Sequence, residues 1–364
     1  MSRILLAWEL GGALGHISML LPVARCLRLR GHEVLFAVKN VGTARQMLDD
    51  EEFRYVQSPL FLGLKRELRD PVNFAGILAE AGFAELETLG GIIKAWQSLF
   101  HIYRPDMLLA QYAPSAQLAA RLAGVPCLRL NMGFECPPDV APFPCFRPWL
   151  KLTKGQLLAR EEAILANINT VFAAHGAPSQ NSLHEALRSD VTLLATLPEL
   201  DHYHGRKRGR YIGPLFIVDD GVEQTWPEGG SSRIFTYLRP DKGTASVLET
   251  LAGCGASVIA YIPGIDRKLL DAFSNERLFI STSKVKLSPL LPDMYLAVTH
   301  GNHGTRSAAL LAGVPLLSIP TTIEQWMLNC NVERLGMGIG VKGARIAKEF
   351  SFALERLLSD GKYR

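Results

Sequence analysis

The chain has 364 residues, of which 48% are hydrophobic and 20% are charged, and its formal net charge at pH 7 is +4. This length exceeds what one small core needs and favours two domains, and the composition is that of a folded globular protein. The small positive charge is compatible with an acidic ligand or with peripheral contact at an anionic membrane. It does not argue for nucleic acid as a partner.

Hydropathy and cysteine spacing bear on the compartment. No stretch approaches the roughly 18 consecutive apolar residues that a transmembrane helix needs. The six cysteines never stand in CxxC spacing and mostly have apolar neighbours, which predicts buried thiols in a reducing environment. We therefore expect a cytoplasmic protein, and peripheral membrane contact stays open.

Strands and helices alternate along the first half of the chain. Residues 3–8 predict an apolar strand, 11–16 a glycine-bearing turn, and 20–30 an amphipathic helix that Gly31 ends. A second strand follows at once, so this is a βαβ unit, which implies a right-handed crossover and a parallel sheet. The expected strands of this half are 3–8, 33–38, 105–110, 126–130 and 191–195, and the expected helices are 20–30, most of 59–103, 115–122 and 155–189.

The composition changes after residue 200. Residues 202–210 are polar and basic, and 219–232 are rich in Gly, Asp, Glu and Pro, which is typical of a solvated linker. The expected strands beyond it are 234–238, 257–262, 278–281, 296–299 and 316–319. We expect domains at 1–205 and 231–364 joined by a linker at 206–230. The predicted fold class is α/β, with two Rossmann-like open-sheet domains facing each other across a cleft.

The most informative segment is a glycine-rich turn between an apolar strand and a run of good helix formers, His300-Gly301-Asn302-His303-Gly304-Thr305. The first N–H groups of a helix have no intrahelical partner and, with the helix dipole, favour an anion such as a diphosphate. His300 and Thr305 could also bind phosphate oxygens through their side chains, whereas His303 is expected to be a surface residue. An ordinary turn that binds nothing is the alternative.

Other candidate residues follow strands. His16 closes the first glycine turn, where a neutral imidazole could take a proton from a hydroxyl group; a structural histidine is the alternative. Glu324 and Gln325 could hold the vicinal hydroxyls of a sugar, or simply begin a solvated helix. Arg239 could reach a phosphate or be an exposed charge.

Several classes of enzyme are disfavoured. The chain has no HExxH, Walker A or nucleophile-elbow motif and no clustered Asp, Glu and His ligands, so we expect neither a metal nor a cofactor. A nicotinamide dehydrogenase is disfavoured because residues 11–15 do not form GxGxxG. The second strand is also followed by Lys39 and Asn40 rather than by an acidic residue for the ribose.

Taken in order, these motifs resemble those of the GT-B glycosyltransferases, specifically the bacterial UDP-glycosyltransferase-like branch. The resemblance runs through nearly the whole chain, and its C-terminal block is the specific part. The matching segments are 11–16 with Pro22, 30–34, 211–215, 291–305, 312–315, and Glu324-Gln325 with Asn329.

The resemblance implies inverting, metal-independent transfer of a sugar from a UDP- or dTDP-sugar to a hydroxyl-bearing acceptor. The acceptor would lie on the N-terminal domain and the nucleotide-sugar on the C-terminal one. The aromatic and apolar segments 59–103 and 134–150 favour an apolar or lipid acceptor. His16 matches the catalytic base and Gln111 the position of its partner. The expected donor-binding residues are Gly12, Gly15, Arg239, Val285, His300, Gly301, Asn302, Gly304, Thr305, Glu324 and Gln325.

The chain departs from the family pattern in places. Gln111 stands where the family often has an aspartate beside the histidine, so a weaker or differently assisted base is expected. Ala308 stands where a glutamate often holds the ribose, and the chain ends at Tyr363-Arg364, short of a last helix of this fold. Two alternatives stay open: a catalytically silent relative that binds a nucleotide-sugar or a partner, and a nucleotide-sugar epimerase.

Overall fold

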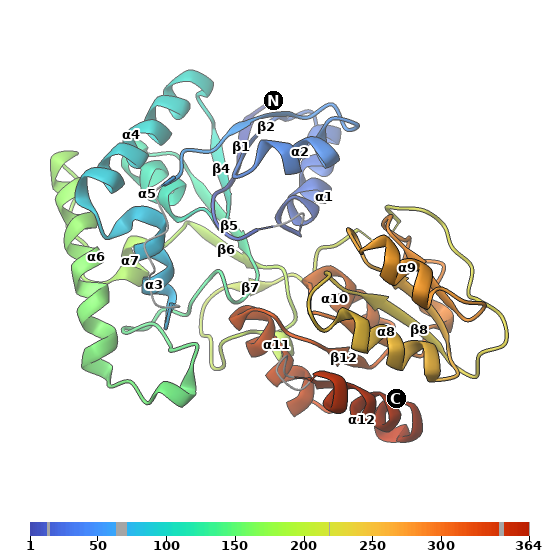
Figure 1. Ribbon diagram of the computed structural model, residues 1–364. Coiled ribbons are helices and arrows are strands. Elements are labelled where there is room, and N and C mark those ends of the chain that lie inside the picture. Colours follow the sequence, from blue (N-terminus) through green and yellow to red (C-terminus); the bar gives the residue numbers. More distant parts are fainter. Residues whose placement is uncertain (13–14, 63–70, 218, 342–345, 364) are drawn as a thin grey trace. The chain divides into compact units, whose positions relative to one another are not determined.

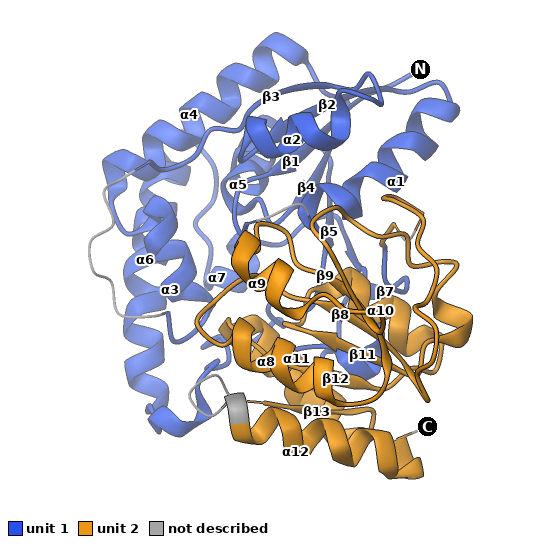
Figure 2. Ribbon diagram, turned by 45° about the vertical axis from the view of Figure 1, so that its right-hand side comes forward, with its two compact units in different colours: residues 1–215 blue, residues 216–364 orange. Residues whose placement is uncertain are grey.

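A computed structural model describes the chain except for residues 13–14, 63–70, 218, 342–345 and 364. The chain divides into two compact units, Met1–Leu215 and Phe216–Arg364, which Figure 2 shows in different colours. The division falls inside the segment 206–230. Each unit is built around its own parallel sheet, and the expectation of two Rossmann-like α/β domains is confirmed.

The first unit contains a seven-stranded sheet of order β3-β2-β1-β4-β5-β6-β7. All its strand pairs are parallel, and β1, which lies between β2 and β4, is almost completely buried, as its run of apolar residues predicts. Its strands are β1 (Arg3–Trp8), β2 (Glu33–Val38), β3 (Arg54–Gln57), β4 (Met107–Gln111), β5 (Cys127–Asn131), β6 (Val191–Leu194) and β7 (Arg210–Tyr211).

Helices lie on both sides of this sheet: α1 and α2 on one side, and α4, α5 and α6 on the other (Figure 1). The helices are α1 (Gly15–Leu29), α2 (Val41–Leu48), α3 (Phe74–Leu78) with a following π-helical turn at Ala79–Phe83, α4 (Leu86–Tyr103), α5 (Pro114–Ala123), α6 (Lys154–Ala174) and α7 (Leu183–Ala186). Short 3-10 turns cover Pro148–Leu150 and Pro198–Leu200.

Several helix predictions were wrong in extent. The first helix begins at Gly15 rather than at residue 20, so His16 belongs to its first turn. Within 59–103, the described residues 59–62 and 71–73 are not helical, and α3 begins at Phe74. The expected helix at 155–189 is also interrupted, since the chain leaves α6 after Ala174.

The second unit contains a six-stranded parallel sheet of order β10-β9-β8-β11-β12-β13. Its strands are β8 (Arg233–Tyr237), β9 (Ser257–Tyr261), β10 (Leu278–Ser281), β11 (Leu296–Thr299), β12 (Leu316–Ser318) and β13 (Gly338–Gly340). Its helices are α8 (Thr244–Gly253), α9 (Arg267–Phe273), α10 (His303–Leu311), α11 (Ile323–Arg334) and α12 (Ile346–Ser359), with 3-10 turns at Leu291–Asp293 and Gly361–Tyr363. One apolar core joins the sheet to α8 and α12.

In both sheets the strand order reverses beside the first strand of the unit. Those switch points are β1/β4 and β8/β11, and in doubly wound sheets ligands bind outside the carboxyl ends of the strands at such points. The register pairs Trp8 with Gln111 at the first and Tyr237 with Thr299 at the second. The topology therefore brings together the candidate residues that follow these strands within each unit.

Two predictions about polarity need correction. We expected Arg206 to belong to a solvated linker. Its side chain is instead only 3% exposed, because it forms an ion pair with the equally buried Asp201, at 2.6 Å between Nε and Oδ2. The cysteines are all free, but Cys26 is exposed on α1 rather than buried.

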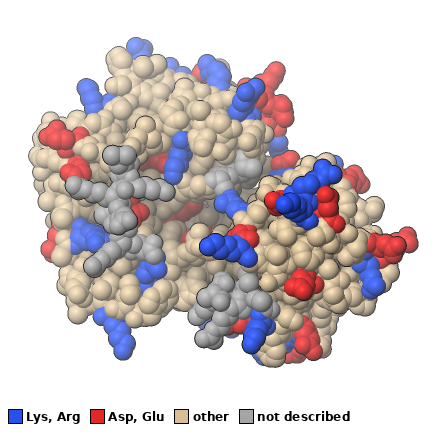
Figure 3. All heavy atoms as spheres, viewed as in Figure 1, with Lys and Arg blue, Asp and Glu red and all other residues tan. Residues whose placement is uncertain are grey.

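Acidic and basic side chains are interspersed on the face shown in Figure 3. No helix in the described part of the chain is long and apolar enough to cross a bilayer.

Candidate active site

The first candidate site forms where β1 and β4 end. His16, in the first turn of α1, is only 8% exposed and stands beside the last residues of both strands. Its ring stacks on Trp8 at 5.2 Å between centroids and lies 6.0 Å from the ring of Tyr112. Packing on two aromatic rings fixes the plane of the imidazole.

A hydrogen-bonded chain leads from this imidazole to a buried carboxylate. His16 Nδ1 lies 2.9 Å from Gln111 Oε1, and Gln111 Nε2 donates to Glu135 Oε2 at 3.0 Å. Glu135 Oε1 is itself 3.5 Å from His16 Nδ1. The backbone N–H of Met132 also donates to Glu135 Oε2, at 3.0 Å. Three groups thus converge on one carboxylate that is 4% exposed.

This arrangement determines which ring nitrogen carries the hydrogen. An ionised carboxylate only accepts, so the Gln111 amide must turn its NH₂ toward Glu135 and its oxygen toward His16. Nδ1 therefore carries the hydrogen and Nε2 presents a lone pair, which is the tautomer that a general base needs. Gly11, at φ +76°, leaves space at that lone pair, since a Cβ there would overlap Nε2.

Two other ionisable groups stand near this site. The Lys39 ammonium donates to the Gly11 carbonyl at 2.6 Å, and burial lowers the pKa of this lysine. Glu9 follows Trp8 and accepts from the N–H groups of Ser115 and Ala116 at the start of α5. Complete burial raises the pKa of Glu9 to about 7, and the helix N–H groups oppose that shift. Glu9 caps α5 rather than contacting the imidazole.

The second candidate site forms where β8 and β11 end. The Thr299 hydroxyl accepts from the Gly301 N–H at 3.1 Å and donates to Asn302 Oδ1 at 2.9 Å. Asn302 in turn donates to the Thr305 hydroxyl at 3.0 Å. The Asn302 side chain therefore braces the turn and does not cap α10, whose first N–H groups keep no side-chain acceptor from their N-cap residue.

His300 is held neutral in this turn. Its Nδ1 lies 3.2 Å from the Tyr237 carbonyl oxygen, which can only accept, so Nδ1 carries the hydrogen. Burial is the main cause that lowers the pKa of His300 to about 4, and Arg239 adds to it. His303, expected at the surface, is half-buried at the first position of α10.

The remaining donor candidates are distributed over both units. Glu324 and Gln325 open α11, and the Gln325 side-chain oxygen accepts from the Thr321 N–H at 2.8 Å, which leaves its NH₂ group to donate elsewhere. Arg239 is exposed after β8, and Val285 is buried where the chain forms a parallel bridge to Val222. Gly12 and Gly15 are exposed beside His16 in the first unit, and Gly304 lies inside α10.

Sequence reasoning missed Glu135. It lies in a Pro- and Cys-rich loop after β5, outside every motif, and 24 residues separate it from Gln111. The only signal was the absence of an acidic residue at position 111, which could have prompted a search for a substitute carboxylate at the end of the neighbouring strand.

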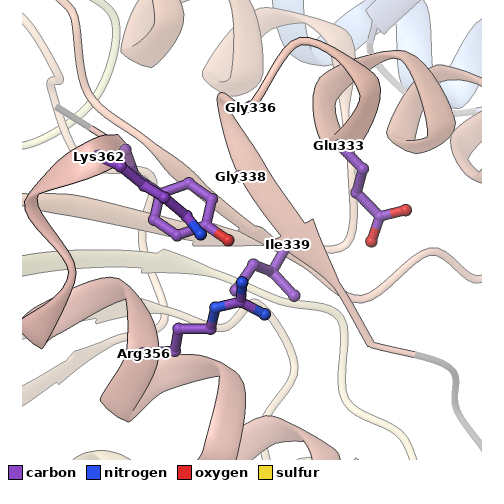
Figure 4. A pocket seen from close by; sticks show the side chains of 7 residues that line it. Glu333, Gly336, Gly338, Ile339, Arg356 and Lys362 are labelled. Carbon is purple, nitrogen blue, oxygen red and sulfur yellow. The ribbon is translucent and has the colours of Figure 1, made fainter.

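One pocket of the second unit lies away from the glycine turn. It is lined by Glu333 at the end of α11, by Gly336 and Gly338 at the start of β13, and by Arg356 and Lys362 (Figure 4). These residues mark the amino end of β13, whereas the glycine turn follows the carboxyl end of β11. Among the described residues, no group of His, Cys, Asp and Glu has the arrangement of a metal site.

Comparison with known proteins links the chain to sugar transferases. No known family profile matches it. A PGL/p-HBAD biosynthesis rhamnosyltransferase of Mycobacterium bovis (strain BCG / Pasteur 1173P2) is 26% identical over 317 residues, which cover 80% of this chain and 69% of the relative. The demethyllactenocin mycarosyltransferase of Streptomyces fradiae is 23% identical, over 97% of this chain and 79% of the relative.

Solved structures share the fold. The glycosyltransferase of kitacinnamycin has a TM-score of 0.74 at 18% identity, covering 100% of this chain and 92% of that one. VinC, solved in complex with dTDP, has a TM-score of 0.69 at 16% identity over 99% and 92%. SpnG complexed with spinosyn aglycone has 0.67 at 17% identity over 100% and 93%. The predicted GT-B fold is confirmed, and the relatives support a glycosyltransferase enzyme.

Proposed function

We propose that the protein transfers a sugar from a nucleoside-diphosphate donor to the hydroxyl group of an apolar acceptor, with inversion and without a metal. The observation that carries this proposal is the chain from His16 through Gln111 to Glu135, which holds an imidazole in the tautomer of a base. A structural histidine would not need a carboxylate that is buried behind it.

In the proposed reaction, His16 Nε2 takes the proton of the acceptor hydroxyl as its oxygen attacks the anomeric carbon. The bond from that carbon to the diphosphate oxygen breaks, and the electron pair leaves with the nucleoside diphosphate. Glu135 stabilises the imidazolium that forms, and the uncapped N–H groups of α10 stabilise the departing diphosphate. The Thr305 hydroxyl accepts from Asn302 and keeps its own hydrogen for a phosphate oxygen.

Aromatic packing supports an apolar acceptor. From Tyr112, beside His16, the ring contacts continue to Phe74 at 6.3 Å and on to Phe143 at 5.8 Å. These rings come from the end of β4, from α3 and from the loop at 134–150, and all three are buried, so separate segments build one apolar cluster beside the proposed base. The spinosyn aglycone with which SpnG is complexed supports testing acceptors of this kind.

For the donor, both UDP- and dTDP-sugars remain in the proposal. The VinC complex supports testing dTDP first. The free thiols fit a reducing compartment, so we propose a cytoplasmic location.

The test is single-turnover transfer from dTDP-glucose and UDP-glucose to a panel of apolar alcohols, comparing wild type with His16→Ala. We expect product with wild type and a loss of about 10²- to 10⁴-fold with the variant. An unchanged rate would remove His16 from the chemistry. Donor binding without turnover would favour the silent relative, and isomerised donor in the absence of acceptor would favour the epimerase.

A further inference from the structure

Arg306 in α10 has an unusual environment. Its side chain is fully buried, yet none of its three guanidinium nitrogens has a hydrogen-bond partner among the residues the structure describes. Burial is the main cause that lowers its pKa to about 10, and the charge of Glu324 opposes this shift. The guanidinium therefore remains a cation at neutral pH, and no described residue forms a hydrogen-bonded ion pair with it.

The guanidinium is directed at the glycine turn. Gly301 has φ +101°, and a Cβ built on it would overlap Arg306 Nη2, so the guanidinium occupies the space of a side chain at position 301. The same turn supplies the uncapped N-terminus of α10, a helix of nine residues. A helix N-terminus and an unpartnered buried cation, two independent features, thus favour an anion at one place.

A buried cation without partners destabilises a fold unless something compensates for its lost hydration. Within the unit, Glu324 acts on Arg306 through its charge, and Arg239 and His300 bring no negative charge. The uncompensated charge of Arg306 therefore favours an anion at the turn above it, and a diphosphate carries such a charge.

We propose that Arg306 is a donor-binding residue that supplies a buried counter-charge to the diphosphate from beneath the turn. This inference rests on the proposed function, since the anion it assigns is the diphosphate of the sugar donor. It adds a side-chain cation to a site otherwise built from backbone N–H groups and a hydroxyl.

The test uses the full chain and three variants: Arg306→Met, which keeps an apolar side chain of similar length, Arg306→Lys, which keeps the charge, and Arg277→Met, an exposed control in the same unit. Melting temperature is measured without ligand. Affinities for dTDP, dTMP, UDP, UMP and inorganic pyrophosphate are measured by calorimetry.

We expect Arg306→Met to melt about 2 to 4 °C higher than wild type without ligand, because it removes an unpaired buried charge. It should bind dTDP and UDP about 10- to 100-fold more weakly, with a smaller loss for the monophosphates. Arg306→Lys should lie between, and Arg277→Met should match wild type. Higher stability together with lower affinity would not arise from a residue that merely supports the fold.

Other outcomes separate the two proposals. Unchanged dTDP and UDP affinity in Arg306→Met, or a lower melting temperature in both Arg306 variants, overturns the inference and leaves the proposed function standing. If wild type binds pyrophosphate but neither nucleotide, and Arg306→Met loses that binding, Arg306 contributes to an anion site, but its assignment to a sugar donor falls together with the proposed function. If wild type binds none of these anions, both proposals are refuted.

Discussion

Replacing Glu135 by Gln isolates the charge of the carboxylate behind His16. The side chain keeps its size, and an amide oxygen can still accept from Gln111 Nε2 and from the Met132 N–H, which both donate to the same carboxylate oxygen. The negative charge 3.5 Å from His16 Nδ1 is lost, and an NH₂ group takes the place of Oε1. The variant should therefore fold normally and bind donor normally.

The size of the effect follows from that distance. Two unit charges separated by 3.5 Å interact by about 5 kcal/mol at an effective dielectric constant of about 20, before competing hydration is subtracted. A hydrogen bond to a charged group retains about 1.5 to 3 kcal/mol of such a gain. Because the imidazolium exists only once the proton has moved, the loss appears in kcat, as a decrease of about 10- to 100-fold.

The assay is transfer from dTDP-glucose or UDP-glucose to the best alcohol of the screened panel, measured as kcat and KM against pH. The acid limb of the profile should move to lower pH in Glu135→Gln, since a neutral imidazole persists further without the anion. The other ionisable groups nearby, Lys39 and Glu9, act on the Gly11 carbonyl and on α5 and are unchanged by the substitution.

A double variant supplies the control. Exchanging the two residues, Gln111→Glu with Glu135→Gln, puts the carboxylate directly against Nδ1 and the amide behind it, at unchanged side-chain lengths. The exchange should restore most of the activity that Glu135→Gln loses. An unaltered kcat and pH profile in Glu135→Gln, or an exchange variant no better than the single one, would refute the role of Glu135.

Three further predictions follow from the packing. Gly11→Ala should reduce kcat by about 10²-fold or more, because a Cβ at this position overlaps His16 Nε2. Because burial raises the pKa of Glu9 to about 7, the free energy of unfolding of the wild type should fall by roughly 3 kcal/mol as pH rises from 4.5 through 7. Urea unfolding of Glu9→Gln should show no such decrease with pH. Arg206→Met should lower the free energy of unfolding by about 3 kcal/mol in the same urea titration, because it leaves the Asp201 carboxylate buried without its cation. The control is Arg208→Met, whose wild-type side chain is 65% exposed, and it should cost less than about 0.5 kcal/mol.

The features that the sequence predicted well are local ones. Apolar runs of five or six residues gave the central strands, and Gly31 and Gly124, both with positive φ, ended helices where the pattern placed them. The edge strands β3 and β13 escaped notice, because one is largely exposed and the other consists of glycine and isoleucine only. Such short strands are defined by their neighbour in the sheet and not by their own residues.

The carboxylate of the candidate active site could not be predicted from spacing. Gln111 stands out as a departure in the sequence, but which acidic residue compensates for it depends on how the loop after β5 folds back on β4. Arg206 illustrates the same limit, since a basic cluster looks solvated until Asp201 and Tyr211 surround its first member. Long-range contacts decide both cases.

Both unexpected features of the chain bear on whether it is an active enzyme or a silent relative. A carboxylate buried behind His16 and an unpaired guanidinium buried beneath the turn at Gly301 are each unfavourable for folding alone. Apolar side chains of similar volume would give a more stable protein at both positions. Proteins keep groups that lower stability mainly where function requires them. Two such groups at the candidate ligand sites therefore indicate that these sites are used. We therefore favour the active transferase over the silent relative, with Gln111 linking the proposed base His16 to a carboxylate from another loop.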